Sequence, residues 1–303
     1  MLEMPESVAW REGQRAQWLA AESWGTPTAK GSEQLKAVVA KWVDSPDHSA
    51  PSWNRGVSVH NFNYAEDDVA LECWNRMTTE AFGWTHGDSV RRLVARFEGR
   101  GVPGYLAYAG KNASSAAEIL ARVRSARMAP FYARVLASKG KGRAYAQAWM
   151  ESFPEEAAAG LIPDALGKDK KARALAEDAI AYLGQKGHSD SVLAIAKKYG
   201  DGAVAPVTEL LERDPLDAVP SKLPKLPDWA NVEALPRPLL KGRHKALPAS
   251  AAEHLLTMLA FSPLDPAYPG IDHVKEACDE QSLVDFAWAL CSTWLGADGS
   301  SAG

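Results

Sequence analysis

The chain has 303 residues, of which 46% are hydrophobic and 24% are charged, and its formal net charge is −4. This composition supports a large buried core, and the slight acidity gives no overall attraction to nucleic acid or an anionic membrane. The sequence contains no apolar run of about 18 residues, as a transmembrane helix requires, and its charged N-terminus lacks the apolar stretch of a signal peptide. Because three scattered cysteines are too few for a disulfide framework, we expect a cytoplasmic protein.

Tryptophan is concentrated at the start of the chain. Seven of the eleven tryptophans lie within residues 1–84. Large aromatic side chains fill irregular space between helices that do not stack in register. We therefore expect a Trp-rich N-terminal helical region over residues 1–100, which caps a more regular array after it.

Helical periodicity dominates the rest of the sequence. Apolar residues recur at helical spacing over residues 172–184, and a second apolar stripe follows over residues 192–199. Alternating strand patterns and Asn-Gly or Asp-Gly hairpin turns are nearly absent. The sequence therefore predicts an all-α fold.

One unit recurs in the middle of the chain. Residues 128–136 and 161–166 each read as a short helix opened by a proline, Pro130 or Pro163. A Lys-rich turn and an Ala-rich second helix follow in both cases. A spacing of roughly 30–35 residues is typical of helical solenoid repeats. We expect stacked antiparallel helix pairs that bury their apolar faces in series.

These residues also resemble known repeat proteins. The stretch from Leu161 to Gly184 resembles a HEAT-type repeat, with its Leu-x-Pro-x-Leu start and Ala-rich second helix. Four later segments are similar to the helical-repeat region of large bacterial WGR-domain proteins, which are molybdate-metabolism-regulator-like and of unknown function. These segments are residues 214–217, 223–229, 234–240 and 262–265. The resemblance covers roughly residues 125–295 and implies a HEAT-like α-solenoid that is part of a larger bacterial regulator. The chain lacks a Trp-Gly-Arg signature.

The predicted organisation has four parts. They are a Trp-rich helical region (1–100), HEAT-like repeats (101–213), a Pro-rich strap (214–248) and C-terminal helices of the same array (249–303). Six prolines between residues 215 and 238 exclude a regular helix in the strap. Because Leu216, Leu223, Leu226 and Trp229 are interleaved with these prolines, we favour an extended strap packed along the array. A peptide-like docking strand or a hinge is the alternative.

No motif for catalysis, cofactor binding or metal binding is present, so we expect neither an enzyme nor a cofactor. One polar cluster near the N-terminus contains the imidazoles and carboxylates that a metal or acid–base site would need. Its members are Asp47, His48, His60, Glu66, Asp67, Asp68, His86 and Asp88. Their spacing fits no metal template, and we favour structural roles. The same holds for His254 beside Glu253, and for Asp272 and His273, which have no nucleophile at a recognisable spacing.

A basic segment offers a different function. Residues 111–143 contain eight basic residues and one acid, for a net charge of +7 in an acidic chain. Such a surface could bind phosphate groups, as it does in HEAT-like solenoids that grip DNA. The candidate contacts are Arg122, Arg124, Arg127, Arg134, Lys139, Lys141 and Arg143. Because the arginines do not share one helical stripe and few stacking aromatics accompany them, we rank nucleic-acid binding as the alternative.

The last helical segment, residues 280–295, is apolar on more than one side. If the array ends there, the outer face of this helix should expose Trp288 or Trp294 to solvent or to a second subunit. Stacked repeats expose extended surfaces that bind other proteins. The predicted function is therefore a non-catalytic helical-repeat scaffold or protein-interaction module with a protein partner.

Overall fold

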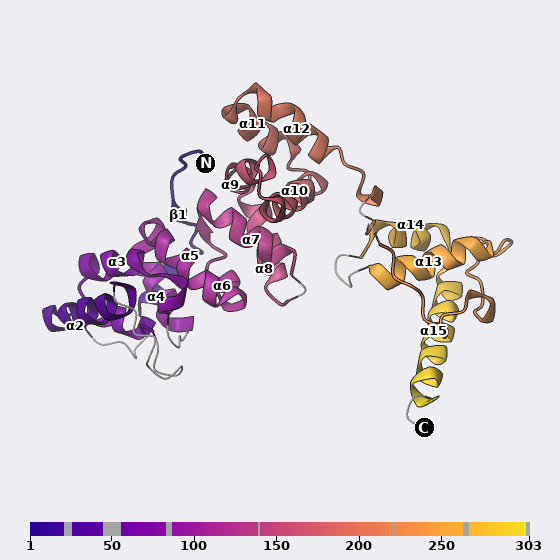
Figure 1. Cartoon of the computed structure of the whole chain (residues 1–303), viewed down its shortest axis with the longest axis horizontal. Helices are drawn as coiled ribbons and strands as arrows, with labels where there is room; N and C mark the ends of the chain where they lie inside the picture. The colour runs from indigo at the N-terminus through magenta and orange to yellow at the C-terminus, as the bar shows by residue number, and fades with distance from the viewer. Residues whose placement is uncertain are drawn as a thin grey trace. The chain divides into compact units, whose positions relative to one another are not determined.

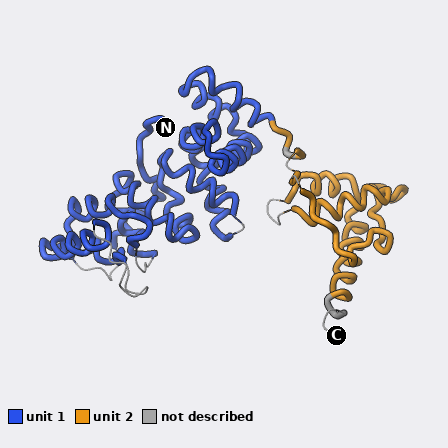
Figure 2. The backbone as a smooth tube through the Cα atoms, viewed as in Figure 1, with its two compact units in different colours: residues 1–212 blue, residues 213–303 orange. Residues whose placement is uncertain are grey.

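The structure is a computed structural model. It describes residues 1–20, 26–44, 56–82, 87–138, 140–217, 219–220, 222–262 and 267–300. Residues 298–300 are described by their backbone alone. Most of the described residues are helical, which confirms the predicted all-α class. The chain forms two compact units, unit 1 over residues 1–212 and unit 2 over residues 213–303 (Figure 2). None of the described helices is both long and apolar enough to cross a membrane.

The N-terminal half of unit 1 consists of short helices joined by 3-10 turns (Figure 1). Local signals set where these helices begin. The side chain of Thr28 caps α2 by accepting a hydrogen bond from the Gly31 N–H at 3.0 Å. Asp67 and Asp68 lie in the first turn of α3, where their negative charges stabilise the positive end of the helix dipole. The elements are β1 (Ser7–Val8), α1 (Gln14–Leu19), α2 (Ala29–Val39), a π-helical turn (Ala40–Asp44), η3 (Val59–Tyr64), α3 (Asp67–Arg76), η4 (Thr79–Ala81), α4 (Gly87–Phe97), η5 (Glu98–Gly101), α5 (Val102–Lys111) and α6 (Ala113–Ile119).

The second half of unit 1 holds the helices from α7 to α12. They follow the short elements β2 (Val123–Arg124) and η6 (Ala126–Met128), and are α7 (Ala129–Leu136), α8 (Arg143–Ser152), α9 (Pro154–Ala165), α10 (Lys170–Gln185), α11 (Ser189–Tyr199) and α12 (Asp201–Leu211). Helix α9 packs against α7 and α11, and α10 packs against α7 and α12 (Figure 1). Successive helices therefore bury one another's apolar faces. The helices predicted over residues 172–184 and 192–199 are confirmed as α10 and α11.

Two fully buried tryptophans organise the core of unit 1. Trp74 packs edge-on against Phe62, and its Nε1 donates to the carbonyl of Gly101 at 3.0 Å. Trp149 stacks on Tyr132 with ring centroids 4.5 Å apart, and its Nε1 donates to a backbone carbonyl of β2 at 2.8 Å. Both indoles are buried without losing a hydrogen bond, which makes them effective core residues.

The tryptophans of the N-terminal region differ in their surroundings. Trp10, Trp18 and Trp42 are partly buried against the core of unit 1. Trp24, Trp53 and Trp84 lie outside the described residues. The apolar core runs without a break from Leu35 to Leu210, and η5 spans the expected boundary between residues 100 and 101. The N-terminal region and the helices after it therefore share one core.

Pro163 does not open a helix, contrary to the prediction for the second repeat unit. Helix α9 begins at Pro154, and Pro163 lies in its last turns. A proline has no N–H, so the carbonyl of Ala159, four residues earlier, loses its helical partner. The hydroxyl of Tyr199 donates to that carbonyl at 2.5 Å and accepts the backbone N–H of Leu2 at 2.9 Å. The proline therefore creates a junction between α9, α11 and the N-terminus. By contrast, Pro130 does lie in the first turn of α7, as expected.

Helix α9 also approaches η6 very closely. A Cβ atom on Gly160 would stand 2.0 Å from the carbonyl oxygen of Ala126 and 2.6 Å from the Cβ of Ala129. Only glycine fits this contact. Near the same place β1 and β2 form a two-stranded antiparallel pair, with Ser7 opposite Arg124. This small sheet, which the sequence did not reveal, ties the N-terminal segment to the middle of unit 1.

The described residues of unit 2 form three α-helices and the Pro-rich segment. Its elements are η7 (Pro215–Asp217), η8 (Val232–Ala234), α13 (Ala249–Phe261), α14 (Pro269–Ala277) and α15 (Glu280–Ser300). Its small core consists of Leu235, Leu255, Leu256 and Phe286. This core lies apart from that of unit 1, so the C-terminal helices form a body of their own.

The Pro-rich segment packs within unit 2. Leu226 and Val232 contact the core of the unit, and the N–H of Leu239 donates to the Oγ of Ser282 on α15 at 2.9 Å. Leu223 is 49% exposed, so it does not provide the anchor that we expected. The prolines exclude a regular helix, and the hydrogen bond to Ser282 holds the segment to α15.

Candidate functional site

The predicted N-terminal polar cluster does not form a site in the described residues. Asp47, His48 and His86 lie outside them. The ring of His60 bonds to the hydroxyl of Tyr64 at 2.7 Å, and Asp88 pairs with Arg91 at 2.7 Å, one helical turn away. Within the described parts of the chain, no group of three or more His, Cys, Asp or Glu side chains could hold a metal ion.

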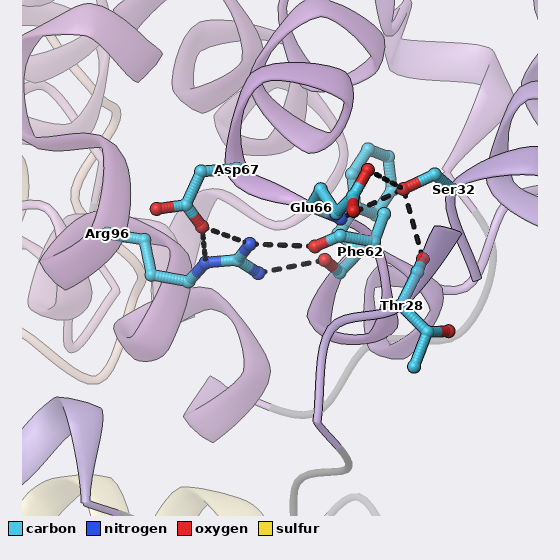
Figure 3. A network of polar contacts seen from close by, with 7 residues as sticks. Thr28, Ser32, Phe62, Glu66, Asp67 and Arg96 are labelled. Carbon is cyan, nitrogen blue, oxygen red and sulfur yellow. Dashed lines mark hydrogen bonds and ion pairs between the residues drawn. The ribbon is translucent and has the colours of Figure 1, made fainter. Parts of the chain in front are cut away.

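Asp67 belongs to a network around Arg96 instead (Figure 3). The guanidinium of Arg96 donates to the carbonyls of Phe62 and Ala65, both at 2.9 Å, and its Nε donates to Asp67 at 2.9 Å. The side chain of Arg96 is only 6% exposed. Because it satisfies two backbone carbonyls where η3 ends, this arginine fixes η3 against α4.

Glu66 also has a structural role (Figure 3). Its backbone N–H donates to the Oγ of Ser32 at 3.0 Å, and that hydroxyl donates to the carbonyl of Thr28 at 3.1 Å. The contacts join the start of α3 to the start of α2. Glu66 and Asp67 therefore hold helices together, which is the structural role that we favoured over metal binding.

His254 and His273 both lie exposed on helices of unit 2. His254 lies on α13. On α14, Asp272 pairs with Lys275 at 2.9 Å, and the ring of His273 lies 3.8 Å from Glu276. Both α14 pairs join exposed side chains one turn apart, the ordinary arrangement on a wet helix face.

The basic residues divide between two segments of unit 1. Arg122 lies just before β2, Arg124 ends β2 and Arg127 lies in η6. The Nε of Arg124 donates to Glu156 at 2.5 Å, and that carboxylate is only 2% exposed in the first turn of α9. A buried carboxylate requires a cationic partner. Arg124 therefore serves the fold, although its side chain is 47% exposed, and Arg127 is exposed as well.

The other four candidates follow the start of α7. They are Arg134, Lys139, Lys141 and Arg143, of which Lys139 lies outside the described residues. Arg134 lines a cavity of about 270 Å³ together with Ser114, Ser138 and Phe131. Lys141 is exposed in the turn before α8, and Arg143 begins that helix. The cavity is lined mainly by small and apolar residues, and Arg134 and the two serines are its polar side chains.

The most distinctive surface in the described chain lies on α15. Four of its large apolar side chains are exposed: Trp288 is 69% exposed, Leu295 60%, Trp294 45% and Val284 41%. Val284, Trp288, Cys291 and Leu295 follow one another at steps of four, three and four residues, so they lie on one side of the helix. We call this side the outer face of α15. The exposure predicted for Trp288 and Trp294 is confirmed.

The opposite side of α15 explains why the helix is apolar on two sides. Ser282 and Phe286 are 6% and 3% exposed, and Ala289 and Leu290 pack against the core of unit 2. This inner face holds the helix to unit 2, while its C-terminal half extends past α13 and α14 (Figure 1). Burial of one face leaves the second without a cover inside the unit. Isolated exposed apolar residues are common on proteins, whereas these four side chains lie close together on one helix.

Sequence reasoning identified this surface but missed other features. The spacing of Trp288 and Leu295 was visible because helical periodicity is a local property. The pairing of Arg124 with Glu156 joins residues 32 positions apart, and no local pattern reveals it. The cavity beside Arg134 was missed for the same reason, since it is formed by α5, α6 and α7 together.

The fold and this surface define a class: an all-α chain of two units with an uncovered apolar helix face. No protein-family model matches the chain, and no solved structure does. The chain is similar to YehI, an uncharacterized protein of Escherichia coli (strain K12), with 24% identity over 282 residues. The similarity covers 89% of this chain and 23% of YehI, so the chain spans less than a quarter of that protein's length.

Proposed function

We propose that the chain is a non-catalytic protein-interaction module, and that the outer face of α15 is the surface with which it binds a helix of a protein partner. One observation carries this proposal: Trp288, Trp294 and Leu295 are among the most exposed apolar side chains described, and they adjoin on one helix. Leaving two indoles in water is unfavourable, and their burial gives a strong hydrophobic contribution to binding.

The sequence of α15 indicates the chemistry of the partner. Residues 287–297 contain no charged side chain. The stripe is therefore bordered by small and neutral residues such as Ala287 and Ser292, both of them exposed. A helix with an apolar, uncharged face packs against such a stripe without leaving a charge buried and unpaired. A charged or extended peptide would lose its solvation without compensation.

The proposal extends to the whole chain as a HEAT-like α-solenoid module of a larger bacterial protein in the cytoplasm. The alternating contacts of α7, α9 and α11 and of α10 and α12 support a stacked array. The similarity to a bacterial protein more than three times longer than the matched region supports a place in a larger molecule. Cys73 and Cys278 are buried free thiols, as a reducing compartment permits. The likeness to molybdate-metabolism-regulator-like WGR proteins remains part of the same proposal.

Photo-crosslinking in the host cell tests the protein-binding surface. A benzophenone amino acid replaces Trp288 in the full chain, and a matched variant carries it at Leu166, which is 43% exposed at the end of α9. We expect a discrete adduct from position 288, and its linked peptide should map to an apolar helix. The control position should give only weak, diffuse products.

The outcome that contradicts the proposal is equally specific. If position 288 gives no adduct beyond that of position 166 in illuminated cells, the outer face of α15 binds no protein there. A linked peptide that is charged throughout would contradict the chemistry inferred for the partner.

Nucleic-acid binding through residues 111–143 remains the second proposal, supported by Arg134, Lys141 and Arg143 around the α7–α8 turn. A mobility-shift assay at low and moderate salt tests it. Binding that weakens with salt and is lost in Arg134→Glu but kept in Arg213→Glu would support this alternative. The absence of any salt-dependent shift would remove it.

A further inference from the structure

The outer face of α15 has the spacing of a coiled-coil seam. In heptad terms Trp288 and Leu295 occupy a positions, and Val284 and Cys291 occupy d positions. The residues that face the core of unit 2, such as Phe286 and the others of the inner face, then fall at b, c and f. The buried residues of α15 therefore occupy different heptad positions from the exposed apolar ones. The a and d positions are free to meet another helix.

We infer that the outer face of α15 pairs antiparallel with the same face of a second copy of this chain. This inference rests on the proposed function and names the partner. An antiparallel pair centred between residues 289 and 290 places Trp288 of each copy against Cys291 of the other. It also places Val284 against Leu295. The large Trp288 then packs against the small Cys291, and Val284 packs against Leu295, which is of similar size. Such pairings fill the space between helices well.

The borders of the seam also match in this arrangement. Antiparallel helices bring g positions beside g positions and e positions beside e positions. Trp294 therefore lies beside Ala287 of the second copy, again a large residue beside a small one. Asp285 lies beside Ser292, so its carboxylate meets a neutral hydroxyl. No charge opposes a like charge along the pair.

A parallel pair of the same helices is unfavourable. It would place Trp288 against Trp288 in one layer, where two indoles compete for the same space. It would also place Glu280 of each copy beside Asp285 of the other, a g-to-e contact of like charges that occurs twice. Both carboxylates are exposed on α15 and would approach each other directly. Charge and shape therefore select the antiparallel orientation.

The area of the seam sets the strength of the dimer. At their exposed fractions the two tryptophans, Leu295 and Val284 present roughly 400–500 Å² of apolar surface per chain. Two copies together bury about twice that, which lies below the roughly 1,200–2,000 Å² of a stable interface. The dimer is therefore a weak one that forms reversibly with concentration.

Sedimentation equilibrium on the full chain over a wide concentration range tests this inference. We expect a monomer–dimer equilibrium, and at least a tenfold weaker association for Trp288→Glu. The control is Leu166→Glu, another exposed apolar residue but one outside the seam, which should leave the equilibrium unchanged. Circular dichroism establishes that both variants keep the helical content of the parent. A monomer at all concentrations, or equal weakening by the two variants, would overturn the inference.

A crosslinking variant tests the orientation. In a Cys291→Ala background, Val284→Cys and Leu295→Cys together should oxidise to a covalent dimer linked between residues 284 and 295. Links between 284 and 284 would instead report a parallel pair and contradict the inference.

Sedimentation equilibrium and photo-crosslinking at position 288 together separate the dimer from the proposed function. A monomer whose position 288 still crosslinks to a different protein in cells would reject the dimer and keep the binding surface. A monomer at all concentrations whose position 288 also gives no adduct in cells would reject both the dimer and the proposed binding surface.

Discussion

The hydroxyl oxygen of Tyr199 and the carbonyl oxygen of Ala159 lie 2.5 Å apart, where the end of α11 meets α9. The contact exists because Pro163 provides no N–H to that carbonyl. Leu2 completes the arrangement by donating its backbone N–H to the same hydroxyl. One phenol therefore compensates a break in a helix and fastens the first residues of the chain.

Removal of this hydroxyl gives a first prediction. Tyr199→Phe leaves the carbonyl of Ala159 without a partner, so we expect the free energy of unfolding to fall by about 1–2 kcal/mol. Urea unfolding followed by circular dichroism measures the change. The control is Tyr145→Phe, at an exposed position on α8, which should change stability by less than about 0.5 kcal/mol. Equal effects of the two substitutions would show that the Tyr199 bond contributes nothing.

The contact between α9 and η6 gives a second prediction. Gly160→Ala places a methyl group against the carbonyl of Ala126, so we expect a loss of about 1–3 kcal/mol. Gly202→Ala is the matched control, because it lies in α12 with open space around its Cβ direction. In that open helix, alanine should stabilise the chain by about 0.5–1 kcal/mol. A destabilised Gly202→Ala together with a neutral Gly160→Ala would reverse the expectation and contradict the packing.

A third prediction concerns the network in Figure 3. Arg96→Met keeps much of the side-chain volume but leaves the carbonyls of Phe62 and Ala65 without donors, so we expect a loss of about 3 kcal/mol. Arg91→Met on the same helix breaks exposed ion pairs with Asp88 and Glu118 and should cost less than about 1 kcal/mol. Thermal unfolding of both variants measures the difference. Similar transition temperatures would show that Arg96 is only a surface residue.

Two buried tyrosines give a prediction about pH. Burial raises the pKa of Tyr105 and of Tyr132 well above the ordinary value. Because the folded-state pKa exceeds the unfolded one, their contribution to stability is fully present below about pH 10 and is lost as the pH rises further. Absorbance at 295 nm should show these phenols ionising together with alkaline unfolding, after the exposed tyrosines. Ionisation of every tyrosine near pH 10 with helical content intact would contradict their burial.

Several features could be predicted from the sequence because they depend on local spacing. Helices α10 and α11 follow from apolar residues three and four positions apart, and the exposure of Trp288 follows from an apolar pattern wider than one face. The missing features depend on distant partners. The carboxylate of Glu6 accepts a hydrogen bond from the hydroxyl of Ser125 at 2.6 Å, although the two residues are 119 positions apart in the sequence. No spacing rule connects them.

The basic segment shows the same limit for the candidate site. A count of charges assigns Arg124 and Arg127 equal weight, but a buried Glu156 pairs with Arg124 alone. The prediction that Pro163 opens a helix was wrong for a related reason. A proline that follows a short apolar run can begin a helix or lie near its end, and the contact with Tyr199 decides which occurs.

Hydroxyl-radical footprinting of Trp288 tests the binding surface most directly. The full chain is irradiated in host extract and in buffer, and oxidation of Trp288 is normalised to that of exposed Tyr145 on α8. Burial of the outer face of α15 by a protein partner should lower the relative oxidation of Trp288 several-fold in extract. An unchanged ratio at all extract concentrations and at all concentrations of the chain itself would contradict the account, because the face would then remain in water in the presence of every proposed partner.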